Sequence, residues 1–298
     1  MEAYFGELAA LLVAVFWTVT ALAFERASLR IGSLSLNLIR LLMGFIFLSL
    51  FTWIYRGMLF PTDASGYNWI WLAVSGMIGF VFGDLFLFKA YAMIGSRFSM
   101  LIMTLAPPIA AVVGWFTLGE KLLPLQLLGM FLTLLGIFLA IFVRKAGKKG
   151  LSMKLSGKGV LFAFLGAAGQ GTGLVLSKYG MLEYDPFAAT QIRLIAAIVG
   201  FALLTTYLKR WKKVFIATRN KGGMSAAALG SFFGPFLGVS FSLLAIRYTE
   251  TGIAATIMAI VPIMIIPPVV LIYKEKVKAL EIIGSVISIA GVALLFLV

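Results

Sequence analysis

The stretch SLSLNLIRLLMGFIFLSLFTWIY occupies residues 33–55 and contains a single charged side chain, Arg40. About 20 consecutive apolar residues are enough to cross the hydrocarbon core of a bilayer as an α-helix. Comparable apolar runs recur on either side of this one, separated by charged residues or by Gly and Pro. The ten predicted helices cover residues 5–25, 33–55, 68–91, 97–117, 123–143, 158–178, 186–208, 224–246, 253–273 and 280–298. We therefore predict an all-α polytopic membrane protein of about ten transmembrane helices.

The composition of the whole chain agrees with a membrane environment. Of its 298 residues, 62% are hydrophobic and 12% are charged, and the mean hydropathy is +1.07. Soluble domains are about half apolar and a quarter charged. The chain has no Cys and no His, which excludes thiol nucleophiles, disulfides, Cys/His metal sites and histidine acid–base chemistry. We expect no metal and no cofactor.

The net charge of +14 could suggest a nucleic-acid partner, but the basic residues lie in short tracts between apolar runs. Cytoplasmic loops of membrane proteins are enriched in Lys and Arg. One alternating set of loops holds 18 of these residues, including the tracts 144–158 and 209–221, and the other set holds four. We therefore expect no nucleic acid, a cytoplasmic location for the first set, and both termini outside a plasma or inner membrane. Because residues 1–7 lack a basic segment, we expect the first helix to be retained and not cleaved as a signal peptide.

The two halves of the chain repeat each other. A shift of 155 places aligns seven Gly, Pro and charged residues: Gly79, Gly83, Pro107, Glu120, Lys121, Gly129 and Gly136 fall on Gly234, Gly238, Pro262, Glu275, Lys276, Gly284 and Gly291. We divide the chain into repeats at 1–146 and 147–298. Five helices is an odd number, so the second repeat must cross the membrane in the opposite direction. Inverted repeats of this kind are typical of secondary transporters, which bind their substrate between the halves.

These repeated residues resemble the EamA-type family of the drug/metabolite transporter superfamily. The pattern runs through Trp17, Asn37–Arg40, Ala90, Pro107, Leu118–Lys121, Gln126, Gly129 and Gly136, and again through Arg193, Ala245, Ala254, Ala255, Pro262, Lys274–Lys276, Glu281, Gly284 and Gly291. The resemblance covers nearly the whole chain and implies transport without naming a substrate. Members of this family are largely exporters or exchangers of amino acids, other metabolites and drugs.

The halves also differ from each other. Gly169–Gly173 stands where the first half has Trp17, and Val239 stands where the first half has Asp84. These differences argue against a symmetric binding site.

Charged side chains inside lipid cost free energy and are therefore candidates for function. Arg40 lies about seven residues into its helix, roughly 10 Å from the cytoplasmic end, and Asp84 lies at a similar depth in the next helix. The two could pair as a fixed link between helices. Alternatively, Asp84 could titrate as the coupling group or bind a substrate amine.

Arg193 is the inverted counterpart of Arg40, but the second half has no matching Asp. It could bind an anionic group such as a carboxylate or phosphate, because guanidinium suits bidentate contact. It could instead pair with backbone carbonyls, Glu183 or Glu250. A further charge, Lys89, is predicted to extend towards the membrane edge.

Gly169-Gln170-Gly171-Thr172-Gly173 is the most unusual segment. Three glycines in five weaken a helix, and they also permit close packing between helices. The segment could therefore be a tight helix contact, or a partly open helix whose Gln170 and Thr172 line the cavity. Trp17 and Thr18 occupy the corresponding place in the first half. Trp17 could form a wall of the cavity or simply pack against its neighbours.

Prolines within the fourth and ninth predicted helices should bend them. We expect kinks at Pro107 and Pro262, which could act as hinges.

Taken together, these features predict a secondary transporter, not an enzyme. We expect export of a small metabolite, an amino acid or related polar or amphipathic compound, by alternating access around a central cavity. No P-loop is present, so a proton or another coupling ion, or exchange, would supply the driving force. The rival functions are a channel or structural membrane subunit, and a membrane-embedded lipid-modifying enzyme.

Overall fold

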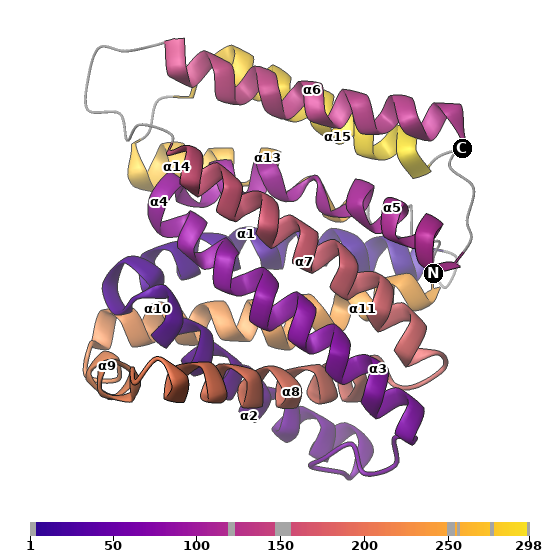
Figure 1. The fold of residues 1–298 in the computed structure, drawn as a ribbon, viewed down its shortest axis with the longest axis vertical. Coiled ribbons are helices and arrows are strands. Elements are labelled where there is room, and N and C mark those ends of the chain that lie inside the picture. The colour runs from indigo at the N-terminus through magenta and orange to yellow at the C-terminus, as the bar shows by residue number, and fades with distance from the viewer. Residues whose placement is uncertain are drawn as a thin grey trace.

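The computed structural model describes residues 4–118, 123–146, 156–248, 254, 257–274 and 277–296. Within these ranges the chain is almost entirely helical and contains no strand (Figure 1). In chain order the elements are α1 (Phe5–Ile31), α2 (Ser33–Arg56), α3 (Gly66–Gly76), the π-helix η2 (Met77–Gly83), α4 (Asp84–Met103), α5 (Ala106–Leu118), α6 (Pro124–Ala146), α7 (Gly157–Met181), α8 (Pro186–Tyr207), α9 (Trp211–Ala217), α10 (Lys221–Ser231), the π-helix η3 (Phe232–Gly238), α11 (Val239–Tyr248), α13 (Val261–Met264), α14 (Ile266–Tyr273) and α15 (Ala279–Phe296).

In the described part of the chain, six helical stretches are long and apolar enough to cross a membrane: Phe5–Ile31, Ser33–Arg56, Gly66–Met103, Gly157–Met181, Pro186–Tyr207 and Lys221–Tyr248. Shorter apolar helices cover Ala106–Phe116, Pro124–Ala140, Val261–Ile272 and Ala279–Leu294. Large apolar side chains face outward, among them Ile54 at 83% exposed and Phe116 at 74%. The predicted all-helical, membrane-type architecture is confirmed, whereas the number of crossings stays a prediction.

Gly95 divides the long stretch Gly66–Met103 into two helices. Its φ of +80° lies in the left-handed region, which glycine adopts without steric cost. Glu25 of α1 accepts hydrogen bonds from the backbone N–H of Ser96 at 3.1 Å and from its hydroxyl at 2.5 Å. This carboxylate satisfies a free donor where the helix restarts. The turn lies between the predicted helices 68–91 and 97–117.

Two helix interruptions lie directly before the prolines expected to bend the chain. Helical geometry stops at Thr104 and Leu105, and Pro107 follows in the first turn of α5. It stops again at Ala259 and Ile260, and Pro262 follows in the first turn of α13. Proline lacks an N–H and is tolerated in a first turn, where that donor has no helical partner. The role of these breaks as hinges stays a prediction.

The two π-helices, Met77–Gly83 and Phe232–Gly238, lie 155 positions apart, the same shift that aligns the repeated residues. A π-turn widens the helix locally and often marks a functional site. Asp84 directly follows the first of these π-helices.

The glycine-rich segment of α7 is continuous α-helix and not open backbone. It packs directly on the π-helix η2, which connects α3 to α4. A Cβ at Gly169 would lie 2.5 Å from the Cα of Gly83, and one at Gly173 would lie 2.9 Å from the Cα of Gly79. The hydroxyl of Ser75 donates to the carbonyl of Gly173 at 2.7 Å. The segment therefore forms a tight helix contact.

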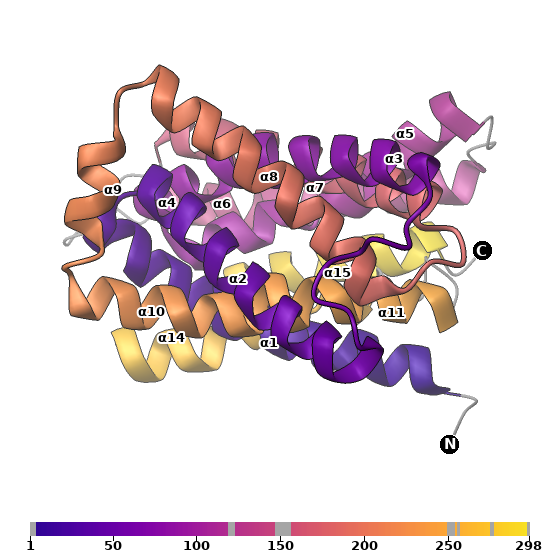
Figure 2. The same ribbon diagram turned by 90° about the horizontal axis from the view of Figure 1, so that it is seen from below.

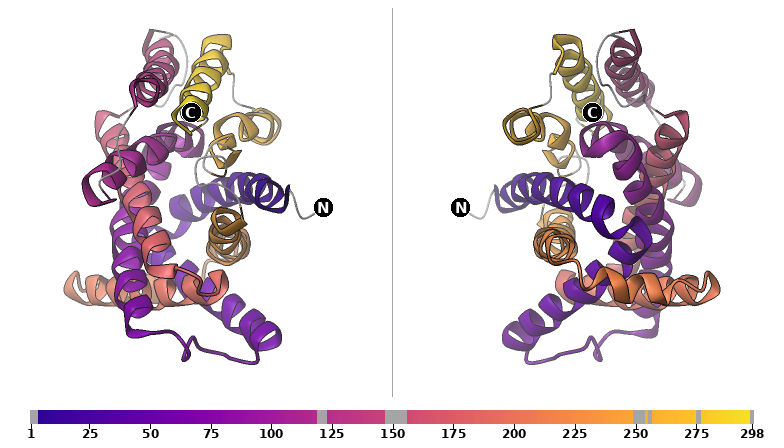
Figure 3. Two further views of the ribbon diagram at one scale, coloured as in Figure 1. Left: turned by 90° about the vertical axis from the view of Figure 1, so that its right-hand side faces the viewer. Right: turned by 90° about the vertical axis from the view of Figure 1, so that its left-hand side faces the viewer.

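The helices α6 and α15 lie side by side at one edge of the bundle (Figures 1 and 3). A Cβ at Gly136 would overlap the carbonyl of Gly284 and the backbone N of Ser288. The hydroxyl of Ser288 lies 2.7 Å from that of Thr104, which connects the helix pair to the rest of the bundle.

At one end of the bundle, the loop after α2 meets the turn after α7. Asp63 accepts hydrogen bonds from Arg56 at 2.6 Å and from the hydroxyl of Tyr184 at 2.8 Å. Burial opposes its ionisation, but these donors outweigh burial and lower the pKa of Asp63. Burial and the bond to Asp63 raise the pKa of Tyr184 to about 12. The helix α9 lies at the opposite end (Figure 2).

Candidate functional site

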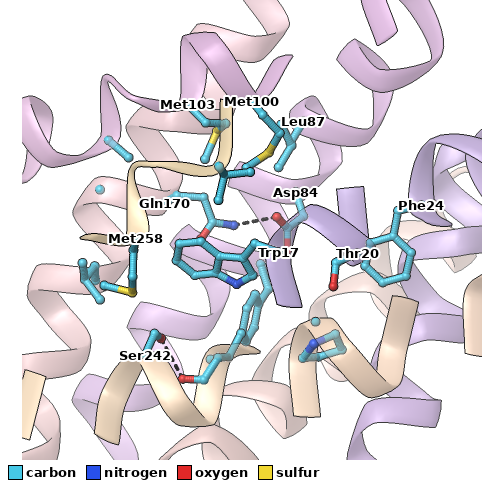
Figure 4. A pocket seen from close by; sticks show the side chains of 18 of the residues that line it. Trp17, Thr20, Phe24, Asp84, Leu87, Met100, Met103, Gln170, Ser242 and Met258 are labelled. Atoms are coloured by element: carbon cyan, nitrogen blue, oxygen red, sulfur yellow. Dashed lines mark hydrogen bonds between the residues drawn. The ribbon is translucent and has the colours of Figure 1, made fainter. Parts of the chain in front are cut away.

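A cavity of about 170 Å³ lies between the helices. One water needs about 10–15 Å³ of such space, so the cavity is large enough for a small organic molecule. Its walls come from both halves of the chain and are largely apolar. They include Trp17, Phe24, Leu87, Met103 and Met258 (Figure 4).

The polar centre of the cavity is Asp84, which is 4% exposed. Gln170 donates to one carboxylate oxygen at 2.5 Å (Figure 4), and Arg40 donates to the other at 2.5 Å. Gln170 also donates to the carbonyl of Gly79, inside the π-helix, at 3.3 Å. Both carboxylate oxygens are therefore occupied, and the network ties α2, α4 and α7 together.

Arg40 has both polar and aromatic partners. Besides Asp84, its Nε donates to the side-chain oxygen of Asn37 at 3.1 Å. Its guanidinium lies 4.8 Å from the ring centre of Phe88 and 5.6 Å from that of Phe80. Such cation–π contacts lower the cost of burying the charge. The expected pairing of Arg40 with Asp84 is present in the structure.

Arg193, on α8, also contacts the ring of Phe80. Its guanidinium lies 4.6 Å from the ring centre of Phe80. A Cβ at Gly76 would overlap the backbone carbonyl of Arg193, so glycine lets the two helices approach closely there. The Nε of Arg193 is buried and has no hydrogen-bond partner within the described ranges.

The expected partners of Arg193 are engaged elsewhere or lie outside the structure's coverage. Glu183 forms a 3.8 Å ion pair with Arg247 on α11. Glu250 lies outside the described residues, as do the repeated residues Glu120, Lys121, Glu275 and Lys276.

Most of the residues predicted to form the site line this one cavity: Trp17, Arg40, Asp84, Pro107, Gln170, Arg193 and Pro262. Two others do not. Thr18 turns its hydroxyl to the carbonyl of Ala14 at 2.8 Å, and Thr172 is absent from the lining. Lys89 lies away from the cavity, with its ammonium 5.4 Å from the ring centre of Phe86.

The cavity also contains polar residues that the sequence analysis did not single out. The buried hydroxyl of Thr20 has no partner among the described residues. Tyr91 donates to the sulfur of Met100 at 3.2 Å, and Ser242 donates to the carbonyl of Val239 at 2.7 Å. Thr20 could have been found from its spacing, since it follows Trp17 by three residues on one helix face. No group of His, Cys, Asp and Glu able to hold a metal occurs in the described part of the chain.

The EamA-like transporter family matches this chain twice, over residues 4–142 and 157–297. An uncharacterized transporter of Clostridium kluyveri is 27% identical over 143 residues, which cover 47% of this chain and 44% of that protein. The uncharacterized transporter YoaV of Bacillus subtilis is 26% identical over 142 residues, covering 47% and 48%. The chain thus spans about half the length of the curated relatives it matches.

One solved crystal structure has the same overall fold as this chain. It superposes with a TM-score of 0.67 and covers 98% of this chain and 96% of its own. Its sequence is 18% identical, so the likeness concerns the fold alone.

Proposed function

This chain belongs to the EamA-like transporter family, and we propose that it is a secondary transporter that moves a small polar or amphipathic metabolite through the cavity between its helices. It is a multi-pass membrane protein. The observation that carries the proposal is the cavity itself, where Arg40, Asp84, Gln170 and Arg193 gather inside apolar helices. Polar groups at membrane depth are costly and mark substrate pathways.

The proposed mechanism is alternating access between two inverted five-helix repeats, 1–146 and 147–298. Three observations support it. The family matches each half separately. The π-turns at Met77–Gly83 and Phe232–Gly238 are related by a shift of 155. The helix interruptions at 104–105 and 259–260 are related by the same shift. Binding between repeats is typical of secondary transporters.

The substrate and direction proposed are an amino acid or related compound moving outward. The cavity supports this class because its apolar walls surround a compact polar centre. Coupling to protons would require a titratable group at the site, and Asp84 is the acidic residue in the cavity lining. If Asp84 carries the coupled proton, Asp84→Asn should abolish the pH dependence of transport. Both oxygens of Asp84 already accept hydrogen bonds. This favours the alternative, in which Asp84 and Arg40 form a fixed ion pair and exchange of substrates drives transport.

The test is counterflow in proteoliposomes made with the purified protein. Vesicles loaded with unlabelled L-phenylalanine, or with other amino acids in turn, are diluted into the same compound carrying a radioactive label. A transporter accumulates label transiently and saturably, whereas a channel or structural subunit gives no overshoot. Ser242→Phe, which would fill part of the cavity, should abolish the overshoot. Thr206→Phe adds a similar volume at an exposed position of α8 and should leave it intact. No overshoot with any amino acid would contradict the proposal.

A further inference from the structure

Two buried arginines contact the ring of Phe80, but they are not equivalent. Arg40 is 3% exposed and is bound by Asp84 and Asn37. Arg193 is 4% exposed, and the structure records neither an ion pair nor a hydrogen bond for its guanidinium within the described ranges. The ring of Phe80 is its close partner. Phe80 attracts a cation but neither neutralises its charge nor fills its hydrogen-bonding positions.

The charges that line the cavity do not balance. Among the lining residues in the described chain, Arg40 and Arg193 are cationic and Asp84 alone is anionic. Asp84 already accepts hydrogen bonds on both oxygens, from Arg40 and Gln170. Burying a charge without a hydrogen-bonded counterion is strongly unfavourable. The second guanidinium is therefore short of one negative charge.

Other carboxylates in the described chain are engaged away from this site. Glu183 pairs with Arg247, Glu25 accepts from Ser96, and Asp185 accepts from the backbone N–H of Ala188. None of them lines the cavity. The missing charge can then come from a molecule that enters the cavity.

We propose that Arg193 binds the single anionic group, a carboxylate or a phosphate, of the molecule that occupies this cavity. The proposal rests on the transport function proposed above and names its substrate class. The guanidinium presents several N–H donors in a planar fork, which matches two oxygens of either oxyanion. The rest of the ligand would lie against the apolar walls, which include Trp17, Leu87 and Met258. An apolar body with one oxyanion fits this surface, and the oxyanion supplies the negative partner that Arg193 lacks.

The experiment uses pairs of compounds that differ in the anionic group. L-phenylalanine is compared with L-phenylalaninamide, benzoate with benzamide, and phenyl phosphate with phenol. The thermal unfolding midpoint of the purified full-length protein is measured against the concentration of each, because a ligand of the folded state raises that midpoint. In at least one pair we expect the member that carries the oxyanion to stabilise the protein and the member that lacks it not to. A response to benzoate or L-phenylalanine indicates carboxylate, and one confined to phenyl phosphate indicates phosphate. The absence of discrimination in all three pairs overturns the proposal.

Substitutions then test whether the selectivity belongs to Arg193. Arg193→Gln should weaken the binding of the anionic probe by roughly 10- to 100-fold, because hydrogen bonds to a charged group contribute about that much to affinity. Arg193→Lys keeps the charge without the fork and should give an intermediate affinity. The matched control is Arg247→Gln, which removes an arginine paired with the exposed Glu183 and should leave the affinity unchanged. Unchanged affinity in Arg193→Gln overturns the proposal.

The unfolding midpoint of Arg193→Gln without ligand provides a second test that needs no substrate. Because Arg193→Gln removes an unbalanced buried charge, its unfolding midpoint should equal or exceed that of the parent protein. A clearly lower midpoint would mean that Arg193 has a structural counterion, and the proposal would fail.

Counterflow separates this proposal from the transport function. If anionic probes bind through Arg193 but no compound gives counterflow, the anion site stands and the transport function fails. If counterflow occurs and Arg193→Gln leaves its apparent affinity unchanged, the transport function stands and the anion site is overturned.

Discussion

Arg40 and Arg193 contact the same aromatic ring, yet only Arg40 has a carboxylate within hydrogen-bonding distance. A buried pair is costly to form, because both ions lose their hydration, but it is far more costly to break by removing one partner. The Arg40–Asp84 pair is therefore expected to show strong energetic coupling.

The substitution Asp84→Asn leaves the Arg40 guanidinium buried without a counterion. We expect it to lower the free energy of unfolding by about 3–5 kcal/mol. The double substitution Arg40→Gln with Asp84→Asn should lose less than the sum of the two single changes, because no charge of this pair is then left alone. Reversible denaturation of the purified protein in detergent micelles would measure this cycle. Additive losses would mean that the pair contributes no coupling.

At the scale of the helices, α7 packs closely against its neighbours beside this site. Its glycines lie so close to η2 and α4 that a side chain at several positions would overlap backbone atoms. This packing brings Gln170 within reach of both Asp84 and the carbonyl of Gly79. The glycine segment therefore shapes the site through its lack of side chains, whereas Gln170 supplies a polar contact.

Gly169→Ala should destabilise the protein by about 1–3 kcal/mol, the usual cost of adding a methyl group to a closely packed contact. The new Cβ would lie 2.5 Å from the Cα of Gly83, and backbone cannot move aside as a flexible side chain can. Gly157→Ala in the same helix is the control, because nothing lies within 4 Å of its Cβ. The thermal unfolding midpoints of both variants would measure this difference in stability. Equal midpoints would contradict close packing at residue 169.

At the scale of the whole molecule, the two alternating sets of predicted loops differ in charge. Loops rich in Lys and Arg are predicted to be cytoplasmic, and the chain lacks Cys, so single cysteines can report sidedness without a background. The loop that contains Thr62 lies at one end of the bundle, and α9, which contains Lys212, lies at the other (Figure 2).

A membrane-impermeant maleimide should therefore label Thr62→Cys in intact cells. It should label Lys212→Cys only after the membrane is opened. Both positions are exposed, so accessibility of the thiol is not limited by packing. The reversed labelling pattern would place the termini inside and contradict the predicted orientation.

Much of the architecture could be predicted before any coordinates were considered. Ten apolar runs, an absence of Cys and His, and residues repeating at a shift of 155 are properties of the linear chain. The same holds for the candidate residues, because a charge such as Arg40 or Asp84 is conspicuous within an apolar run. Thr20 was signalled only by its spacing from Trp17, and nothing local distinguished Ser242 from packing residues.

The sequence by itself determined the membrane class, the family resemblance and the charged residues at membrane depth, because hydropathy and charge are read one residue at a time. Only the tertiary structure decided how those charges combine. It pairs Asp84 with Arg40 and Gln170, leaves Arg193 facing the cavity without a carboxylate, and turns Thr18 away. These outcomes depend on distances between helices far apart in the chain, which the close glycine contacts and the helix breaks set.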